Sequence, residues 1–178
     1  MVTRVPVTCR SVPRSMDLTA ESPHPLARIR FAFQSEVYWQ DRLRAFEGAS
    51  PTLDYLTTDS AGRTTVSMTM RFGGDQLPDP LRRLRLAGLD IVQRERWFAD
   101  EDGGLRGEIG VDALRTPISG HGAVLLTAVP PGTRLAGTAT VEVGVPLIGG
   151  TIARFITGLL ANGIVDIVRI TDAWLDEN

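Results

Sequence analysis

The chain has 178 residues, of which 43% are hydrophobic and 22% are charged, and its formal net charge at pH 7 is -2. This length and composition predict one globular domain with a substantial core, and they exclude extensive disorder. The near balance of 19 basic and 21 acidic residues creates no overall field that would attract nucleic acid or an acidic membrane, so we expect local recognition of any partner.

The N-terminal residues 1–14 contain Arg and Pro without hydrophobic periodicity, which predicts a flexible tail. A single domain over 15–178 would follow, and Met16 offers an alternative translation start to Met1. The tail lacks the continuous apolar run of a secretory signal, and the lone Cys9 has no internal disulfide partner. These features together predict a cytoplasmic protein.

The first predicted elements are one strand and two short helices. Apolar and polar residues alternate over 15–21, which favours a strand. Ser22 and Pro23 then provide an N-cap and a first-turn proline for a helical pattern over 24–46. A polar break at 34–36 divides this pattern, so two helices are expected between the first strand and the next.

The period changes to two after residue 52, as is typical of strands. The connections are short and rich in Gly, Pro and Asp, so the sheet is predicted to be mostly antiparallel with one buried face. The predicted strands cover 53–57, 66–72, 89–99, 105–114, 121–129 and 135–145, and a short amphipathic segment covers 79–86.

A long apolar helical pattern begins after residue 150 and ends near residue 175. Its apolar stripe is wider than contact with a flat sheet requires, which predicts that a curved sheet surrounds the helix. Arg154, Asp166 and Arg169 divide the pattern into uncharged runs well below the roughly 20 residues that span a bilayer. The chain therefore predicts an α+β fold without stable membrane insertion.

Four segments resemble the START-like superfamily, which is also called SRPBCC or polyketide-cyclase-like. They are RERW at 94–97 before an acidic glycine turn, PPGT at 130–133, VEVGVPLIGG at 141–150 and TDAWL at 171–175. Within the superfamily, the chain most resembles an actinobacterial family of unknown function, over about 15–175. The resemblance implies a helix-grip fold, with a curved seven-stranded sheet around the C-terminal helix and a central hydrophobic cavity. It brings no set of catalytic residues.

Strand alternation and helical spacing select side chains that would face this cavity. Three polar candidates are Tyr55, Glu95 and His121, of which His121 alternates with Ala123 on an apolar strand. Two other interpretations stay open: Glu95 could belong to a surface ladder of ion pairs, and His121 could end a strand. The apolar candidates for ligand contact are Met68, Met70, Trp97, Ile109, Val111, Leu125, Ile152, Phe155, Ile156 and Leu159.

We expect the protein to bind or transport a hydrophobic or amphipathic small molecule, such as a lipid, a fatty acyl chain or a polyketide-like ring. One alternative is a cyclase-type or hydratase-type enzyme that uses polar residues of the same cavity. The other is an interaction module with a filled interior and no ligand. Binding is favoured over catalysis because the sequence lacks a nucleophile elbow, a phosphate-binding loop and metal-ligand spacing. No cofactor, metal or nucleic-acid partner is predicted, and the oligomeric state is left open.

Overall fold

In a computed structural model of the protein, the described residues are 13–45, 49–77, 79–82, 85, 87–144 and 149–178. Within these ranges, the side chains of 76, 80–81, 149–153, 155–156 and 158–162 are not described. The elements are β1 (Arg14–Ser22), α1 (Leu26–Gln34), α2 (Glu36–Arg44), β2 (Ser50–Thr58), β3 (Thr64–Gly73), η1 (Gly74–Gln76), α3 (Asp79–Arg82), β4 (Gly88–Ala99), β5 (Leu105–Ala113), β6 (Ile118–Val129), β7 (Gly132–Val143) and α4 (Gly149–Glu177).

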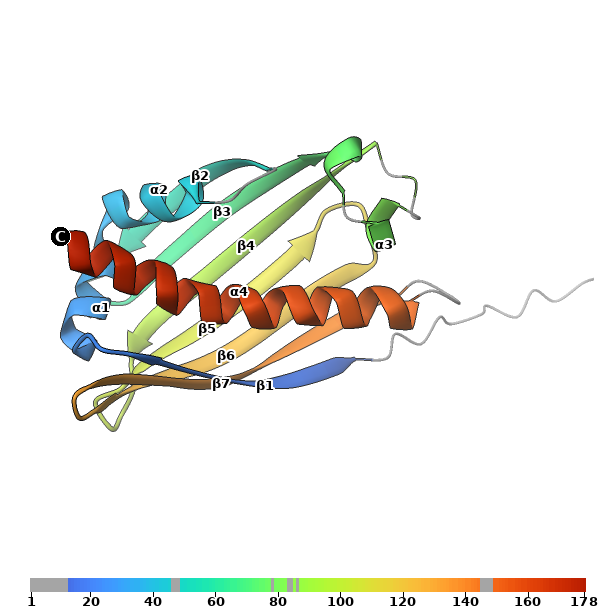
Figure 1. Ribbon diagram of the computed structural model, residues 1–178. Coiled ribbons are helices and arrows are strands. Elements are labelled where there is room, and N and C mark those ends of the chain that lie inside the picture. Colours follow the sequence, from blue (N-terminus) through green and yellow to red (C-terminus); the bar gives the residue numbers. More distant parts are fainter. Residues whose placement is uncertain (1–12, 46–48, 78, 83–84, 86, 145–148) are drawn as a thin grey trace, which may run out of the picture.

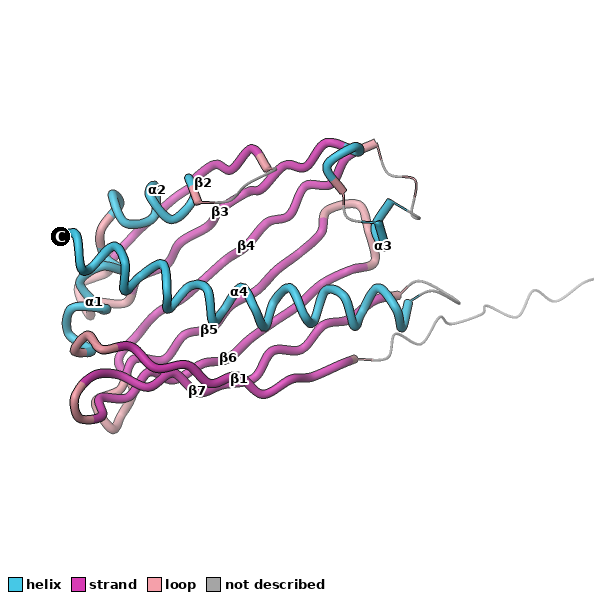
Figure 2. The backbone as a smooth tube through the Cα atoms, viewed as in Figure 1, coloured by secondary structure: helices cyan, strands magenta, loops and turns pink. Residues whose placement is uncertain are grey.

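The seven strands form one sheet in the order β1-β7-β6-β5-β4-β3-β2, and every neighbouring pair is antiparallel. The sheet curves around α4, which crosses its concave face, while α1 and α2 cover one end (Figure 1). From β2 to β7 each strand pairs with the next one in sequence. The connection from β1 to β2 carries α1 and α2, and the connection from β3 to β4 carries η1 and α3 (Figure 2). The predicted α+β helix-grip architecture is confirmed.

The hairpin turn between β2 and β3 shows how local chemistry sets this topology. The Asp59 carboxylate accepts hydrogen bonds from the backbone N–H groups of Ala61 at 3.0 Å and Arg63 at 2.9 Å. Gly62 adopts a φ of +74°, a left-handed conformation that glycine takes without a steric penalty. The predicted turn between these strands is therefore confirmed.

The first helix begins at Leu26, so the prediction of an N-cap at Ser22 is wrong. His24 precedes Pro25, and the residue before a proline is driven away from helical backbone into an extended conformation. Pro25 is itself extended, with φ -62° and ψ 144°, so helical backbone starts only after it. Ser22 instead ends β1, and its hydroxyl donates a hydrogen bond to the Asp172 carboxylate in α4.

Large aromatic side chains fill the space between the sheet and α4 beneath α1 and α2, a region called here the packed end. The ring centroids of Phe33 and Trp97 lie 4.5 Å apart, and Tyr38 contacts Trp39 edge-on at 5.2 Å. Trp97 lies directly over β5, where a Cβ atom on Gly107 would collide with the indole ring. Glycine on β5 thus allows an indole to lie against the sheet.

The predicted tail falls mainly on residues 1–12, which are outside the described residues, and β1 begins at Arg14. In the part of the chain that the structure describes, no helix is both long enough and apolar enough to cross a membrane.

Candidate functional site

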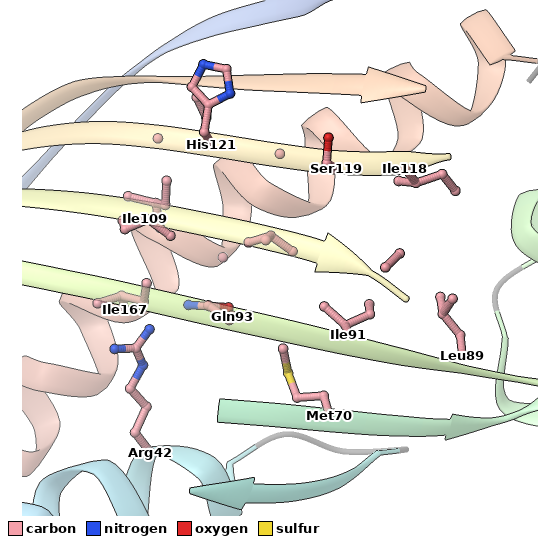
Figure 3. A pocket seen from close by; sticks show the side chains of 17 residues that line it. Arg42, Met70, Leu89, Ile91, Gln93, Ile109, Ile118, Ser119, His121 and Ile167 are labelled. Atoms are coloured by element: carbon pink, nitrogen blue, oxygen red, sulfur yellow. The ribbon is translucent and has the colours of Figure 1, made fainter. Parts of the chain in front are cut away.

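A cavity of about 180 Å³ lies between the sheet and α4, next to the packed end. Met70 of β3, Ile91 of β4, Ile109 of β5 and Ile164 of α4 contribute apolar side chains to its wall. In Figure 3 the cavity extends from Arg42 at one end to Leu89 at the other. Side chains that are far apart in the sequence meet here because five adjacent strands present the same face to α4.

Small residues on the central strands create this empty space. Gly122 of β6 lies opposite Ile109 of β5 and Ala139 of β7. A Cβ atom on Gly122 would stand 3.4 Å from the Thr138 carbonyl oxygen and 3.9 Å from both Ile109 and Ile164. These distances are ordinary van der Waals contacts, so the wall could accommodate a side chain that the sequence does not supply.

A buried ion pair lies where the cavity meets the packed end. Arg42 of α2 is only 1% exposed, and its Nη2 donates to Glu95 Oε1 of β4 at 2.8 Å, while Nη1 reaches Oε2 at 3.5 Å. Gln93 Nε2 and Trp97 Nε1 also donate to this carboxylate, at 2.6 and 2.8 Å. The fully buried Glu95 therefore has its charge compensated and its oxygens saturated with hydrogen bonds.

The neighbours of the ion pair define the charge of this region. Burial by itself would lower the pKa of Arg42, but attraction to Glu95, together with hydrogen bonds to Glu95 and Tyr38, outweighs that effect and raises it. Burial raises the pKa of Tyr38, whose hydroxyl lies 2.7 Å from that of Thr171. The Arg42 guanidinium also stacks 4.7 Å above the Trp39 ring. Arg42 is thus charged, Tyr38 is neutral, and the pair with Glu95 carries no net charge.

A family model described as a protein of unknown function, DUF2505, matches residues 17–175. The chain belongs to this family. Uncharacterized protein Rv0481c of Mycobacterium tuberculosis is 25% identical over 173 residues, which cover 94% of this chain and 99% of that protein. Uncharacterized protein Mb0491c of Mycobacterium bovis matches with the same identity and coverage. The predicted resemblance to an actinobacterial family of unknown function is confirmed.

Several solved structures share the helix-grip fold of this DUF2505 member. The crystal structure of Ara h 8.0201 matches with a TM-score of 0.57 and 9% identity, covering 94% of this chain and all of that one. Norcoclaurine synthase from Thalictrum flavum matches with a TM-score of 0.57 and 10% identity, covering 99% and 95%. Protein Ms6760 from Mycobacterium smegmatis gives 0.53 and 16%, covering 92% and 91%. At these identities the likeness establishes the helix-grip fold alone.

The predicted apolar site residues of this DUF2505 member divide between two regions. Met70, Ile109 and Val111 line the cavity. Met68 and Trp97 are not among the residues that line the cavity; they belong to the hydrophobic core and are each 2% exposed. Four predicted residues of α4 lie outside the described side chains: Ile152, Phe155, Ile156 and Leu159.

Of the two predicted site residues on β6, His121 borders the cavity, whereas Leu125 is not among the residues that line it. On β6 the buried residues are Ile118, Gly120, Val124 and Leu126, so the alternate positions belong to the outer face of the sheet. The exposed His121 borders the cavity between two glycines, and its ring points away from Arg42 and Gln93 (Figure 3). This strand is nearly uniformly apolar, so its sequence contains little information about which alternate set is buried.

Tyr55 is also outside the cavity, because a bulge reverses the alternation of β2. Leu53 pairs with Met68, but Tyr55 already pairs with Ser67, so two steps on β2 match one on β3. The bulge turns Tyr55 to the outer face, where it is 44% exposed. Of the three polar candidates, only Glu95 has its side chain in the interior, directly behind the cavity wall.

Sequence reasoning missed Arg42 as a site residue. Arg42 follows Tyr38 by four positions and Trp39 by three, so all three occupy the buried face of α2. A charged residue on the apolar face of a short amphipathic helix is the signal that could have identified it. Gln93 could be found from its alternation with Glu95, which the sequence analysis used only for the carboxylate.

Proposed function

We propose that this protein binds a small apolar or amphipathic molecule in the cavity between the sheet and α4. The observation that carries the proposal is the cavity of about 180 Å³ with a largely apolar wall, in a molecule whose other end is densely packed. Apolar cavities of about 150 Å³ stay dry and bind benzene. The space therefore accommodates one aromatic ring or a short stretch of an acyl chain, and burial contributes about 25 cal/mol per Å² of apolar surface.

The size of the cavity favours a ring-sized ligand, or the end of a longer lipid or polyketide-like molecule. Drug-sized ligands occupy pockets of about 300–1,000 Å³, and such pockets are larger than this cavity of about 180 Å³. A structure of norcoclaurine synthase in complex with dopamine and hydroxybenzaldehyde matches this chain with 12% identity and a TM-score of 0.55. Both are small ring compounds, which supports a ligand of this size for the related fold.

Catalysis receives less support from the same geometry. Proton transfer requires polar side chains that converge on the reacting atoms. Tyr55 and His121 direct their side chains to the outer face, and the oxygens of Glu95 already accept hydrogen bonds from three neighbouring residues. Binding is accordingly the function that the arrangement favours.

Two leucine substitutions test whether the cavity is the binding site. Gly122→Leu places a side chain in the cavity, whereas Gly110→Leu adds the same side chain at a position where a Cβ atom meets nothing within 4 Å. Toluene binding, followed by NMR shifts of the Ile109 and Ile164 methyl groups, should weaken at least tenfold in Gly122→Leu. The Gly110→Leu variant should bind as the unchanged protein does. Absence of saturable toluene binding, or equal binding by both variants, would contradict the proposal.

A further inference from the structure

Few polar side chains of the described lining direct their polar atoms into the cavity. The polar lining residues are Arg42, Gln93, Ser119 and His121. The side chains of Ser119 and His121 lie on the outer face of the sheet, as the alternation of β6 requires (Figure 3). Arg42 is held within the protein by Glu95 and by a hydrogen bond to Tyr38. Among the described lining residues, Gln93 is thus the one whose side chain can serve a ligand.

The orientation of the Gln93 amide is fixed from behind the cavity wall. Its Nε2 donates to Glu95 Oε1 at 2.6 Å, and this carboxylate also accepts from Arg42 and Trp97. An ionised carboxylate only accepts, so the amide must turn its nitrogen to Glu95 and its oxygen away. In Figure 3 the nitrogen lies on the Arg42 side and Oε1 on the side of Ile91, along the cavity.

The Gln93 oxygen is an acceptor in apolar surroundings. No donor among the described residues reaches Oε1, and Gln93 is half-buried. It pairs with Val111 of β5, and Ile91 precedes it on the same face of β4. An entirely apolar ligand would displace water from this oxygen and leave it without a donor, which is costly. A ligand that brings its own donor avoids this cost.

The charges around the amide favour a donor without charge. Glu95 already accepts hydrogen bonds from three neighbouring residues and balances the charge of Arg42. An ammonium group would donate to Gln93, but it would be buried near the Arg42 guanidinium without a free counter-charge. A carboxylate offers no donor, so it would only oppose the amide oxygen.

We infer that the ligand carries an uncharged hydroxyl or N–H group, which donates a hydrogen bond to Gln93 Oε1. The two groups share the chemistry that this acceptor recognises. The apolar body of the molecule lies against Ile91, Ile109 and Val111. The inference rests on the proposed function and specifies the ligand class of the same cavity.

Four ring compounds of similar size, measured by isothermal titration calorimetry at pH 7, test the inference on the unchanged protein. 4-Fluorotoluene has no donor, p-cresol has a hydroxyl, p-toluidine has an uncharged amine, and 4-methylbenzoate is an anion. We expect p-cresol and p-toluidine to bind about fivefold tighter than 4-fluorotoluene, which is the net contribution of one hydrogen bond. We expect 4-methylbenzoate to bind most weakly.

Two methionine substitutions assign the effect to one amide. Gln93→Met keeps the length of the side chain and removes Oε1, and the preference for p-cresol over 4-fluorotoluene should fall about tenfold, because the buried hydroxyl loses its acceptor. The control is Gln40→Met, the same change at an exposed position of α2 whose amide donates to Glu36. This variant should keep the preference of the unchanged protein.

A spectroscopic measurement covers the case in which Gln93→Met does not fold. The side-chain carbonyl carbon resonance of Gln93, followed by NMR in the unchanged protein, should move downfield on addition of p-cresol and stay in place with 4-fluorotoluene. A carbonyl group that accepts a hydrogen bond is more polarised than one that meets an apolar ligand. Equal responses to the two compounds would overturn the inference.

The outcomes separate the two proposals. If none of the four compounds binds, the cavity is not a binding site and the proposed function fails together with the inference. If 4-fluorotoluene binds as tightly as p-cresol and p-toluidine, or if 4-methylbenzoate binds most tightly, the donor assignment is overturned while binding in the cavity stands. If Gln93→Met folds and keeps the full preference for p-cresol, Gln93 is not the acceptor and the inference is likewise overturned.

Discussion

The packed end and the cavity are built on the same strands, yet one is filled and the other is hollow. On β4 the inward side chain is Trp97 at the packed end and Ile91 at the cavity. On β6 it is Leu126 at the packed end, and Gly122 occupies the corresponding inward position at the cavity. The backbone pairing is continuous across both regions. The size of the inward side chains, rather than the helix-grip backbone, thus determines where this fold leaves space.

The Arg42–Glu95 pair stands at the border between these regions and belongs to both. On one side, Glu95 accepts from Trp97, whose ring is part of the aromatic cluster. On the other side, Arg42 and Gln93 line the cavity. A buried pair of this kind adds little net stability when intact, but it becomes costly when one partner is removed.

The largest effect is expected from Glu95→Ala, which breaks this border. Arg42 would stay buried without its counter-charge, and such losses cost about 3–5 kcal/mol in the free energy of unfolding. The control is Glu108→Ala, which removes the exposed partner of Arg96 and should cost at most about 1 kcal/mol. Guanidinium chloride unfolding monitored by tryptophan fluorescence measures both. Equal losses of unfolding free energy in the two variants would show that the buried pair matters no more for stability than the exposed one.

Two alanine substitutions compare the regions directly. Gly107→Ala drives a methyl group into the Trp97 ring, and overpacking of this kind costs about 1–3 kcal/mol. Gly122→Ala adds a methyl group at ordinary contact distances, and relief of the glycine cost should leave stability unchanged or raise it by about 0.5–1 kcal/mol. Thermal unfolding followed by circular dichroism distinguishes them. A Gly122→Ala variant as unstable as Gly107→Ala would mean that the cavity is not open space.

Most of the fold could be predicted because periodicity and turn residues determine it locally. The hairpin around Asp59 and Gly62, the long α4 and the seven strands follow from patterns within short windows. The start of α1 was wrongly predicted just after Ser22. Pro23 and Pro25 both signal a helix start, and only Pro25, which is nearer to Leu26, determines the boundary.

The candidate site was less predictable because it depends on alternation and on missing side chains. One bulge at Leu53 turned Tyr55 outward, and the glycines of β6 gave no hydrophobic signal for its inward face, so the outer positions of His121 and Leu125 were not apparent. Arg42 reaches the site from α2 and contacts Glu95, a residue 53 positions later in the sequence. No window of the sequence contains such a contact.

Exclusion of water from the packed end can be tested through Tyr38, which is fully buried. Burial raises its pKa above the ordinary 10.0, so the neutral phenol stabilises the fold below pH 10 and this contribution is lost as the pH rises through the folded-state value. Tyr38 and Tyr55 are the only two tyrosines of the chain. In Tyr55→Phe protein, phenolate absorbance at alkaline pH should therefore appear only together with loss of the near-ultraviolet circular dichroism signal. Ionisation in the folded protein would contradict tight packing around Tyr38.

The smallest effect is expected at the edge of the packed end, where Asp172 of α4 accepts a hydrogen bond from Ser22. Burial raises the pKa of Asp172 from its ordinary 3.8, against the opposing effect of that hydrogen bond. A raised folded-state pKa means that the contribution of Asp172 is fully present below about pH 3.8 and is lost as the pH rises through the folded-state value. Asp172→Asn removes the charge and keeps an acceptor for Ser22. It should therefore be more stable than the unchanged protein at pH 7, by less than about 1 kcal/mol because solvent screens a half-buried group. The gain should shrink on acidification towards pH 4 in thermal unfolding, and a gain that grows instead would show that the ionised carboxylate stabilises this edge.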